Sequence, residues 1–417
     1  EKFYPSLDIA SLQMANRYNK EYHVVFAAYR STGIGNTYYA RWTQKVLTST
    51  ERKEDQMDYW QLNPADDSEI QFLQTGYYRF SFRCCQNYSS NAYVQIYVSN
   101  SGNDICYHYA SSANNIRSYN FNDIRQFTEG QTLKFYVSTG TLYDEAISTY
   151  LCIEKIPEKI LSSVGIWKAT TSGSYYRYWN SAIKSSDRYQ IKSNQNLTVN
   201  KGGLYRVSAR VHTNYGSRGN HQMQMYEYRN GSNHQHNSFQ ASYNTNYQCH
   251  MFDVVCAFKQ DDYVSFYDGS YGSANSAPYD AVQIQHIPFP DMVGAWKSSN
   301  VYNGNQRVWD YETWCSELLY KLDDNKSQIE IQQAGNYRIS CNTTQYQGSQ
   351  VAGYSALYVN NSEYCKSRMG GYGSTYYYTT SIQEIARFKK GDKIHIYSSN
   401  PCNDDKGYNS LFIEKLM

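Results

Sequence analysis

The sequence predicts an all-β protein built from three tandem β-sandwich units, and two observations support this prediction. One short phrase occurs three times, as Gly-Tyr-Tyr-Arg-Phe-Ser from Gly76, Gly-Leu-Tyr-Arg-Val-Ser from Gly203 and Gly-Asn-Tyr-Arg-Ile-Ser from Gly335. Helical periodicity is nearly absent, and short alternating stretches are separated by turn signals every eight to twelve residues or so, which is typical of sandwiches and barrels.

Each copy of the phrase alternates with the period of a half-buried strand. Tyr78 and Phe80 point to one face, and Arg79 and Ser81 point to the other. The second and third copies repeat this alternation. We expect the Tyr/Phe face to line a core, the arginines to point away from it, and the leading glycine to lie in the turn before the strand.

Three further anchors follow each phrase in the same order. The first is an alternating run that ends at an Asn-rich turn, as in a hairpin (94–98, 223–227, 355–359). The second is a turn followed by a strand, with Asp261 in place of Gly130 and Gly391; Asp tolerates the left-handed region better than most residues. The third is a closing apolar strand (151–156, 282–287, 411–416). Their shared order predicts three homologous domains.

The predicted organisation is an N-terminal arm (1–22) and three units (23–158, 159–290, 291–417). A unit of roughly 130 residues is long enough to bury its own core. The linkers around Pro157 and Pro288 are short and contain proline, so they should hold neighbouring units close together. The arm has no counterpart in the other units, and its apolar residues are candidates for assembly contacts: Phe3, Tyr4, Leu7 and Ile9.

Charge and hydropathy exclude several classes of partner. The net charge is +2, with 39 basic and 37 acidic residues, which gives no footprint for nucleic acid or for a polybasic membrane anchor. No apolar run approaches the length of a transmembrane helix. A chain that opens Glu1-Lys2 is expected to be already processed, and we predict a secreted, extracellular protein.

The ten cysteines fall into the three units as four, two and four, and even counts favour disulfides within units in an oxidising compartment. The candidates are Cys84, Cys85, Cys106, Cys152, Cys249, Cys256, Cys315, Cys341, Cys365 and Cys402. Buried free thiols are the alternative. Sequons that agree with secretion as a glycoprotein lie at Asn87, Asn196, Asn230, Asn325, Asn342 and Asn360.

No catalytic motif stands out, so we expect no enzyme and no catalytic residue. No Cys/His spacing suits zinc, and His234 and His236 fit a polar loop better than a metal site; no metal is expected. No cofactor is expected either. Calcium stays open as a weak alternative at Asp66-Asp67 and Asp404-Asp405, which fit loops better.

Tyrosine is abnormally frequent, with 46 residues against 15 Phe and 7 Trp. A core does not need so many hydroxyl groups, because each buried one requires a partner. Many tyrosines should therefore lie at surfaces, where they suit protein contacts and stacking on sugars. Compositional drift in a protein rich in Tyr, Ser and Asn is the alternative.

The order of these motifs resembles the globular head of complement and the related tumour-necrosis-factor-like domains. The motifs that carry the resemblance are, in order, Gly-x-Tyr-x-Phe-Ser, an apolar run before Asn, a Gly-Asp turn and a closing apolar strand. The Gly-Asp turn is complete only at Gly391-Asp392. The resemblance implies jelly rolls of ten strands that associate as trimers. Because three copies are fused here, it implies an intrachain pseudo-trimer, with Tyr136, Tyr267 and Tyr397 as candidate contacts near the axis. No collagen-like stalk is present.

Two classes of function remain. The first is a structural building block of an extracellular matrix, filament or adhesive layer, which self-associates through Tyr-rich surfaces. The second is a soluble recognition protein that binds a glycan or a protein receptor. Electron microscopy would show ordered assemblies in the first case and discrete particles in the second, and a glycan array would test the second directly.

Overall fold

The structure is a computed structural model of the 417-residue chain. It describes residues 25–31, 33–34, 38–48, 59–88, 94–99, 102–106, 115–138, 141–142, 148–169, 171–172, 175–214, 219–242, 247–268, 280–298, 300–302, 305–347, 353–369, 376–400 and 409–416. The predicted assembly arm (Phe3, Tyr4, Leu7, Ile9) lies outside the described residues. So do Asp404, Asp405 and Cys402.

Each unit contains two main antiparallel sheets, which we call the inner and the outer sheet. In unit 1 the inner sheet has the order β10-β7-β13-β1-β4, with β12 beside β7, and the outer sheet has the order β5-β6-β11-β8-β9. The inner strands are β10 (Asn115–Phe127), β7 (Gly76–Tyr88), β13 (Tyr150–Lys155), β1 (Val25–Arg30), β4 (Gln44–Thr48) and β12 (Thr141–Leu142). The outer strands are β5 (Trp60–Asn63), β6 (Asp66–Phe72), β11 (Thr132–Val137), β8 (Val94–Val98) and β9 (Gly102–Cys106), and β2 (Gly33–Ile34) pairs with β3 (Ala40–Arg41).

Unit 2 repeats this arrangement, with the inner order β17-β14-β25-β20-β23 and the outer order β18-β19-β24-β21-β22. The inner strands are β17 (Ser181–Lys184), β14 (Val164–Lys168), β25 (Ala281–His286), β20 (Gly203–Asn214) and β23 (Tyr247–Phe258). The outer strands are β18 (Tyr189–Lys192), β19 (Asn196–Val199), β24 (Tyr263–Asp268), β21 (Gly219–Arg229) and β22 (Ser232–Ser242), and β15 (Thr171–Ser172) pairs with β16 (Arg177–Tyr178).

Unit 3 has the inner order β29-β26-β37-β32-β35 and an outer sheet in which β36 lies between β33 and β31. The inner strands are β29 (Tyr311–Cys315), β26 (Val293–Lys297), β37 (Asn409–Lys415), β32 (Gly335–Gln347) and β35 (Tyr376–Phe388). The outer strands are β27 (Asn300–Tyr302), β28 (Gln306–Val308), β36 (Lys393–Ser398), β31 (Ile329–Ile331), β30 (Tyr320–Leu322), β33 (Gly353–Val359) and β34 (Ser362–Met369).

These paired sheets confirm the predicted fold class of three tandem jelly rolls. The repeated phrase begins β7, β20 and β32, and in each unit the closing strand pairs with it in the same register, so that Arg79 faces Glu154 across the ladder. The Tyr/Phe face of each phrase lies in a core cluster between the two sheets. Asp261 has a φ of 69° where Gly130 has 82° and Gly391 has 87°, as the repeat predicts.

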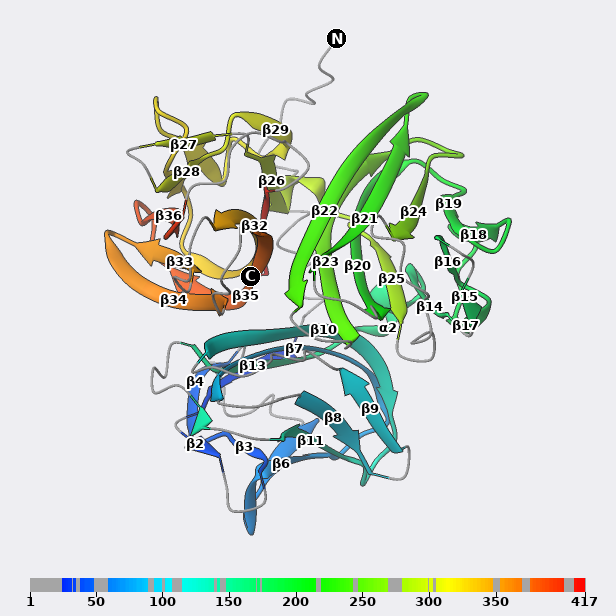
Figure 1. The fold of residues 1–417 in the computed structure, drawn as a ribbon, viewed down its shortest axis with the longest axis vertical. Coiled ribbons are helices and arrows are strands. Elements are labelled where there is room, and N and C mark those ends of the chain that lie inside the picture. Colours follow the sequence, from blue (N-terminus) through cyan, green and yellow to red (C-terminus); the bar gives the residue numbers. More distant parts are fainter. Residues whose placement is uncertain are drawn as a thin grey trace.

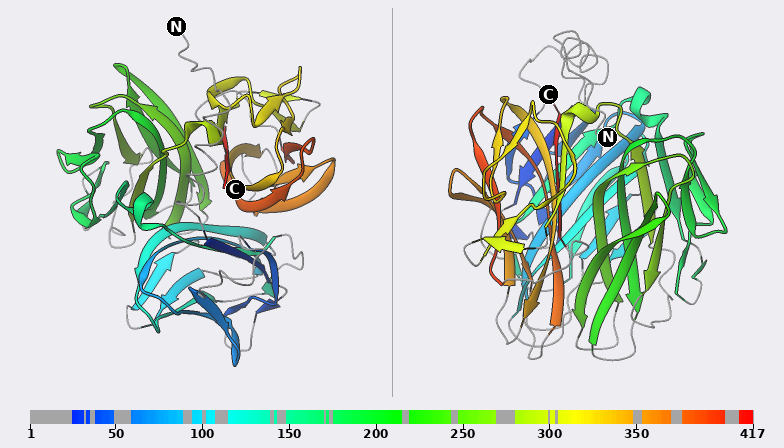
Figure 2. Two further views of the ribbon diagram at one scale, coloured as in Figure 1. Left: turned by 180° about the vertical axis from the view of Figure 1, so that it is seen from behind. Right: turned by 90° about the horizontal axis from the view of Figure 1, so that it is seen from above.

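The three units surround a common axis, with the inner sheets turned toward it (Figure 1). The short linkers, α2 (Glu158–Leu161) and η2 (Pro290–Met292), lead from one unit into the next. Seen from above, the three sandwiches stand side by side with their long strands along the axis (Figure 2).

Three apolar clusters join the units, and each occupies equivalent positions. Ile124 and Ile156 of unit 1 pack with Val164 and Ile166 of unit 2, which we call the 1–2 junction. The 2–3 junction contains Val255, Ile287, Val293 and Ala295, and the 3–1 junction contains Ile385, Leu416, Phe26 and Ala28. Each unit thus presents one surface to the next unit and another to the previous one. This closed, heterologous arrangement confirms the intrachain pseudo-trimer.

Candidate functional site: a charged axis and three tyrosine clusters

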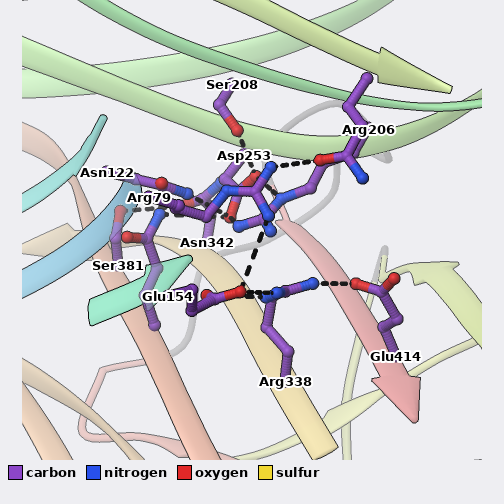
Figure 3. Close-up of polar contacts among 12 residues, drawn as sticks. Arg79, Asn122, Glu154, Arg206, Ser208, Asp253, Arg338, Asn342, Ser381 and Glu414 are labelled. Atoms are coloured by element: carbon purple, nitrogen blue, oxygen red, sulfur yellow. Dashed lines mark hydrogen bonds and ion pairs between the residues drawn. The ribbon is translucent and has the colours of Figure 1, made fainter. Parts of the chain in front are cut away.

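The arginines of the repeated phrase meet where the three inner sheets converge (Figure 3). Arg79 lies on β7, Arg206 on β20 and Arg338 on β32, and all three are nearly fully buried. Alternation along the strand turns them away from the core of their own unit, as predicted. Because neighbouring units cover that face, the arginines become part of a second, polar core, which we call the axial cluster.

The contacts of these arginines run around the axis in one direction. Arg79 of unit 1 donates to Gln285 of unit 2, and Arg338 of unit 3 donates to Glu154 of unit 1. Arg206 of unit 2 lies over the ring of Phe412 of unit 3, 5.0 Å from its centroid. Each guanidinium group therefore reaches into the next unit of the cycle.

Carboxylates compensate the charge of the axial cluster. Arg206 donates to both oxygens of Asp253 at 2.7 Å, and Ser208 donates to the same carboxylate at 2.7 Å. Asn122 of unit 1 donates to Asp253 across the junction at 3.1 Å. Arg338 binds Glu154 and, through its other terminal nitrogen, Glu414. Three arginines thus share three carboxylates.

The electrostatics of the axial cluster follow from burial and from these pairings. Burial, with repulsion by Arg206 and Arg338, lowers the pKa of Arg79 to about 9. Burial alone would raise the pKa of Glu154, but Arg338 and Arg79 outweigh it and hold that pKa below its ordinary value. Asp253 is also buried, and Arg206 lowers its pKa. Glu154 and Asp253 therefore stay ionised, and their charges help to hold the units together.

A second set of cations repeats at the last residue of each first core strand. Arg30 of unit 1 pairs with Glu384 of unit 3, which also accepts from Arg83 at 3.0 Å. Lys168 of unit 2 lies in the field of Asp123 of unit 1. Lys297 of unit 3 lies 3.7 Å from a carboxylate oxygen of Glu227 of unit 2. These cations all point back to the previous unit of the cycle.

The tyrosines predicted for the axis lie instead on the outer sheets, and that prediction is corrected. The ring of Tyr136 on β11 contacts Tyr38 and Tyr39 of the same unit, at 6.2 and 5.5 Å between centroids. The prediction that these tyrosines point away from the core was correct. It assumed, however, that the sheet carrying them faces the axis, whereas the inner sheets do. Tyr267 and Tyr397 occupy the equivalent places on β24 and β36.

Together with their neighbours these residues form one tyrosine cluster on each outer sheet. Tyr267 contacts Tyr175, Tyr176 and Tyr226, at 5.8, 5.2 and 6.1 Å. Tyr397 contacts Tyr354 and Tyr358, at 5.7 and 6.0 Å. The partially exposed tyrosine pairs at equivalent positions are Tyr97 and Tyr136, Tyr226 and Tyr267, and Tyr358 and Tyr397.

The predicted disulfides are wrong for the cysteines whose side chains the structure describes. Cys84, Cys85, Cys152, Cys249, Cys256, Cys315, Cys341 and Cys365 carry thiols. All but Cys315 are buried. Cys341 and Cys365 both lie in the core of unit 3, where they behave as small apolar residues and burial raises their pKa. The side chains of Cys106 and Cys402 are outside the described residues.

The candidate glycosylation sites differ in exposure. Asn230, Asn325 and Asn360 lie in exposed turns, and Asn196 is partly buried. Asn342 is corrected, because it is only 7% exposed and accepts a hydrogen bond from Ser381 in the axial cluster. The side chain of Asn87 is outside the described residues.

The histidines and the acidic pair that were considered as metal sites lie in surroundings that the sequence did not predict. His236 is buried on β22, next to Glu227, and does not belong to a loop, whereas His234 is partly exposed. Asp66 and Asp67, the pair considered for calcium, form ion pairs with Lys134 and Arg41. In the described part of the chain, we find no helix with the length and hydropathy that a membrane crossing requires.

Comparison with known proteins adds little to these observations. No family model matches this chain, and no curated protein matches it. Solved structures similar to it include murine APRIL at pH 8.5, 8.0 and 5.0, with TM-scores of 0.23, 0.24 and 0.25. Each match has 13% sequence identity and covers 32% of this chain and 99% of the APRIL chain. The fold assignment therefore stands on the order and register of the sheets themselves.

Proposed function

We propose that this chain is a non-enzymatic, extracellular building block that self-associates through the tyrosine clusters of its three outer sheets. The observation that carries the proposal is the recurrence of one tyrosine pair at the same register in all three units: Tyr97 and Tyr136, Tyr226 and Tyr267, and Tyr358 and Tyr397. The cores beneath these pairs do not require tyrosine, because the rings lie on the opposite face of the strand from Phe135, Phe266 and Ile396.

The exposure of the clusters supports a role in contacts. Tyr38 is 51% exposed and Tyr176 is 36% exposed, and both flank the repeated pairs. A tyrosine ring offers a large amphipathic surface at a low cost in conformational entropy, which suits it to protein interfaces. Rings that are already packed against one another lose still less freedom when a partner binds.

The pseudo-trimer gives these clusters a fixed geometry. Because the three units are joined by buried junctions within one chain, the three clusters point outward in defined directions. A node with three equivalent outward contacts builds a branched layer or network, and binding at several weak surfaces adds up through effective concentration.

Sedimentation velocity and negative-stain electron microscopy of the purified chain test the proposal. We expect concentration-dependent assemblies, and we expect the triple variant Tyr136→Ser, Tyr267→Ser, Tyr397→Ser to remain a single particle. The matched control replaces three exposed apolar side chains elsewhere, one in each unit, with serine: Val46, Ile183 and Leu318. Discrete particles at all concentrations, or equal loss of assembly in the control, would contradict self-association.

A glycan-binding function is the second candidate, and one observation favours it. The rings of Tyr354 and Tyr397 are inclined by only 26°, and those of Tyr175 and Tyr267 by 27°, so these stacked rings are held in a fixed orientation, as stacking on a sugar requires. Glycan-array signals from single particles, lost in the same triple variant, would support recognition in place of assembly.

A further inference from the structure

One buried residue of unit 2 does not follow the pattern of the repeat. Glu227 lies on β21 next to Tyr226, at the place that Val98 occupies beside Tyr97 and Val359 beside Tyr358. Its register partner Val264 is likewise equivalent to Leu133 and Ile394. Glu227 is 0% exposed. A carboxylate in place of a valine is costly to bury, so the fold alone does not explain it.

Three other polar side chains surround this carboxylate. His236 on β22 and Cys256 on β23 are buried, and one ligand atom from each, with one from Glu227, lies within 4.8 Å of the others. Lys297 reaches in from β26 of unit 3. His236 Nε2 lies 3.0 Å from Glu227 Oε2 and 3.3 Å from Lys297 Nζ, and Lys297 Nζ lies 3.7 Å from Glu227 Oε2.

The three separations among Glu227, His236 and Lys297 are close to the edge of a small tetrahedron, and the ligand atom of Cys256 lies within 4.8 Å of those of Glu227 and His236. Metal–ligand bonds of about 2.0–2.1 Å to nitrogen and oxygen place neighbouring ligand atoms of a tetrahedral zinc site about 3.3 Å apart. Carboxylate, imidazole and thiolate are the usual protein ligands of a borderline divalent cation, and the deprotonated amine of a lysine offers a further nitrogen lone pair. The other oxygen of Glu227, Oε1, makes no hydrogen bond, and its neighbour is Arg229 Nε in an ion pair at 3.4 Å.

The 2–3 junction differs from the other two junctions because the acidic residue that faces the cation in those two is replaced by an apolar one. At the 3–1 junction Arg30 meets Glu384, and at the 1–2 junction Lys168 lies near Asp123. The equivalent position in unit 2 is Val254, as the shared register of β10, β23 and β35 shows. A cavity of ≈ 10 Å³ lies there, and its lining includes Val254, His236 and Lys297.

We propose that the 2–3 junction holds a site for a borderline divalent cation of the Zn²⁺ class, with Glu227, His236, Cys256 and Lys297 as its four ligands. Binding exchanges the cation for two protons, one from the Cys256 thiol and one from the Lys297 ammonium. The group of four residues is neutral before the exchange and neutral after it. The ligands come from both units, so the cation closes this junction.

The protonation of the group without metal agrees with this exchange. Burial, with repulsion by Lys297, lowers the pKa of His236 to about 4, so its ring nitrogen is available as a neutral donor. Although burial opposes it, His236 and Lys297 lower the pKa of Glu227 to about 2. Burial lowers the pKa of Lys297 and raises that of Cys256. Arg229 and His234 also face the carboxylate, Arg229 through an ion pair of 3.4 Å with Oε1.

Titration of the full chain with Co²⁺, followed by absorbance, tests the proposal without any assay of activity. We expect one equivalent to bind, with an intense near-ultraviolet thiolate-to-cobalt band and the visible bands of a tetrahedral ion. Zn²⁺ should displace it. The affinity should rise on the order of 100-fold per pH unit, because two protons leave.

Matched variants decide between this site and other thiols. Cys256→Ser should lose the near-ultraviolet band and His236→Ala should bind about tenfold or more weakly, whereas Cys315→Ser, at the partly exposed thiol, should behave as the parent chain. Lys297→Met should bind more weakly, with a pH dependence of about tenfold per unit. Absence of the thiolate band in the parent chain overturns the site, and tighter binding by Lys297→Met overturns the four-ligand assignment. Circular dichroism and the Tm in chelator show that each variant is folded.

Discussion

Arg338 and Arg41 carry the same charge, but their surroundings give their ion pairs different weights. Arg338 is nearly fully buried and binds Glu154 and Glu414, whereas Arg41 pairs with Asp67 where both side chains are largely exposed. Solvent screens an exposed pair and leaves it little net stabilisation. A buried pair is different, because loss of one partner leaves an uncompensated charge in a region of low dielectric.

We therefore expect Glu154→Gln to lower the free energy of unfolding by about 3–5 kcal/mol, since Arg338 and Arg79 lose their shared carboxylate. Urea unfolding followed by fluorescence measures this change. Asp67→Asn removes the partner of Arg41 and serves as the control, for which no measurable change is expected. Equal effects of the two variants would show that the axial cluster is not a buried charge network.

The buried tyrosines make a prediction for alkaline pH. Burial raises the pKa of Tyr150, Tyr189 and Tyr320 well above the ordinary value of 10.0. The folded state therefore favours the neutral phenol, and its stabilisation is complete below pH 10 and falls as the pH rises above it. In a titration followed at 295 nm, we expect exposed tyrosines to ionise first and these three to ionise only with unfolding. A single smooth titration with no loss of ellipticity would contradict this.

Two residue-level predictions, a glycosylation site at Asn342 and an axial contact at Tyr136, failed for one physical reason. Alternation along a strand shows that both residues point away from the core of their own unit. It does not show whether solvent or another unit covers that face. The inner sheets are covered, so Asn342 is buried, and the outer sheets are open, so Tyr136 is not at the axis.

At the scale of elements, the clearest success of the repeat is the turn that opens its second anchor, just before the strand. Gly130, Asp261 and Gly391 adopt the left-handed conformation that the substitution of Asp for Gly indicated. The hairpin strands β8, β21 and β33 also contain the alternating runs from which they were predicted. Such elements depend on local sequence, so one chain with three copies is sufficient to identify them.

We expect Gly391→Ala to destabilise the chain by about 1–2 kcal/mol, because a Cβ atom is disfavoured at a φ of 87°. Gly391→Asp should cost less, since Asp261 occupies the equivalent turn in unit 2. Asp tolerates this region better, and open space surrounds the Cβ position of Gly391, so crowding does not confuse the comparison. Thermal unfolding of the two variants measures the difference. The reverse order of stability would contradict the turn conformation.

For the whole molecule, the sequence was sufficient to predict three units around an axis, but not the chemistry of that axis. The fusion of three similar units by short linkers favours a closed ring. Which sheet makes the contacts depends on how whole units dock. The residues that form the junctions, such as Ile124, Val255 and Ile385, look like ordinary strand residues in the sequence. The metal ligands proposed above escaped notice because Glu227, His236, Cys256 and Lys297 lie on four strands of two units.

The closed ring has one junction that no linker spans, and this difference can be measured. Units 1 and 2, and units 2 and 3, are joined through α2 and η2. No linker joins units 3 and 1, which in the described residues meet through the 3–1 junction, ion pairs and hydrogen bonds. Ile385 and Ile124 occupy equivalent positions at the 3–1 and 1–2 junctions. Ile385→Asp and Ile124→Asp therefore place the same charge in equivalent apolar surroundings, and each should lower the free energy of unfolding by about 3 kcal/mol or more.

Their effects on shape should differ. At the 1–2 junction the short linker keeps the effective concentration of the two surfaces on the order of millimolar or higher. The ring of the Ile124→Asp variant should therefore stay nearly closed. At the 3–1 junction no short tether opposes separation. We expect Ile385→Asp to increase the radius of gyration in small-angle X-ray scattering and to divide thermal unfolding into two transitions. Equal scattering curves for the two variants would show that the linkers do not hold the ring together.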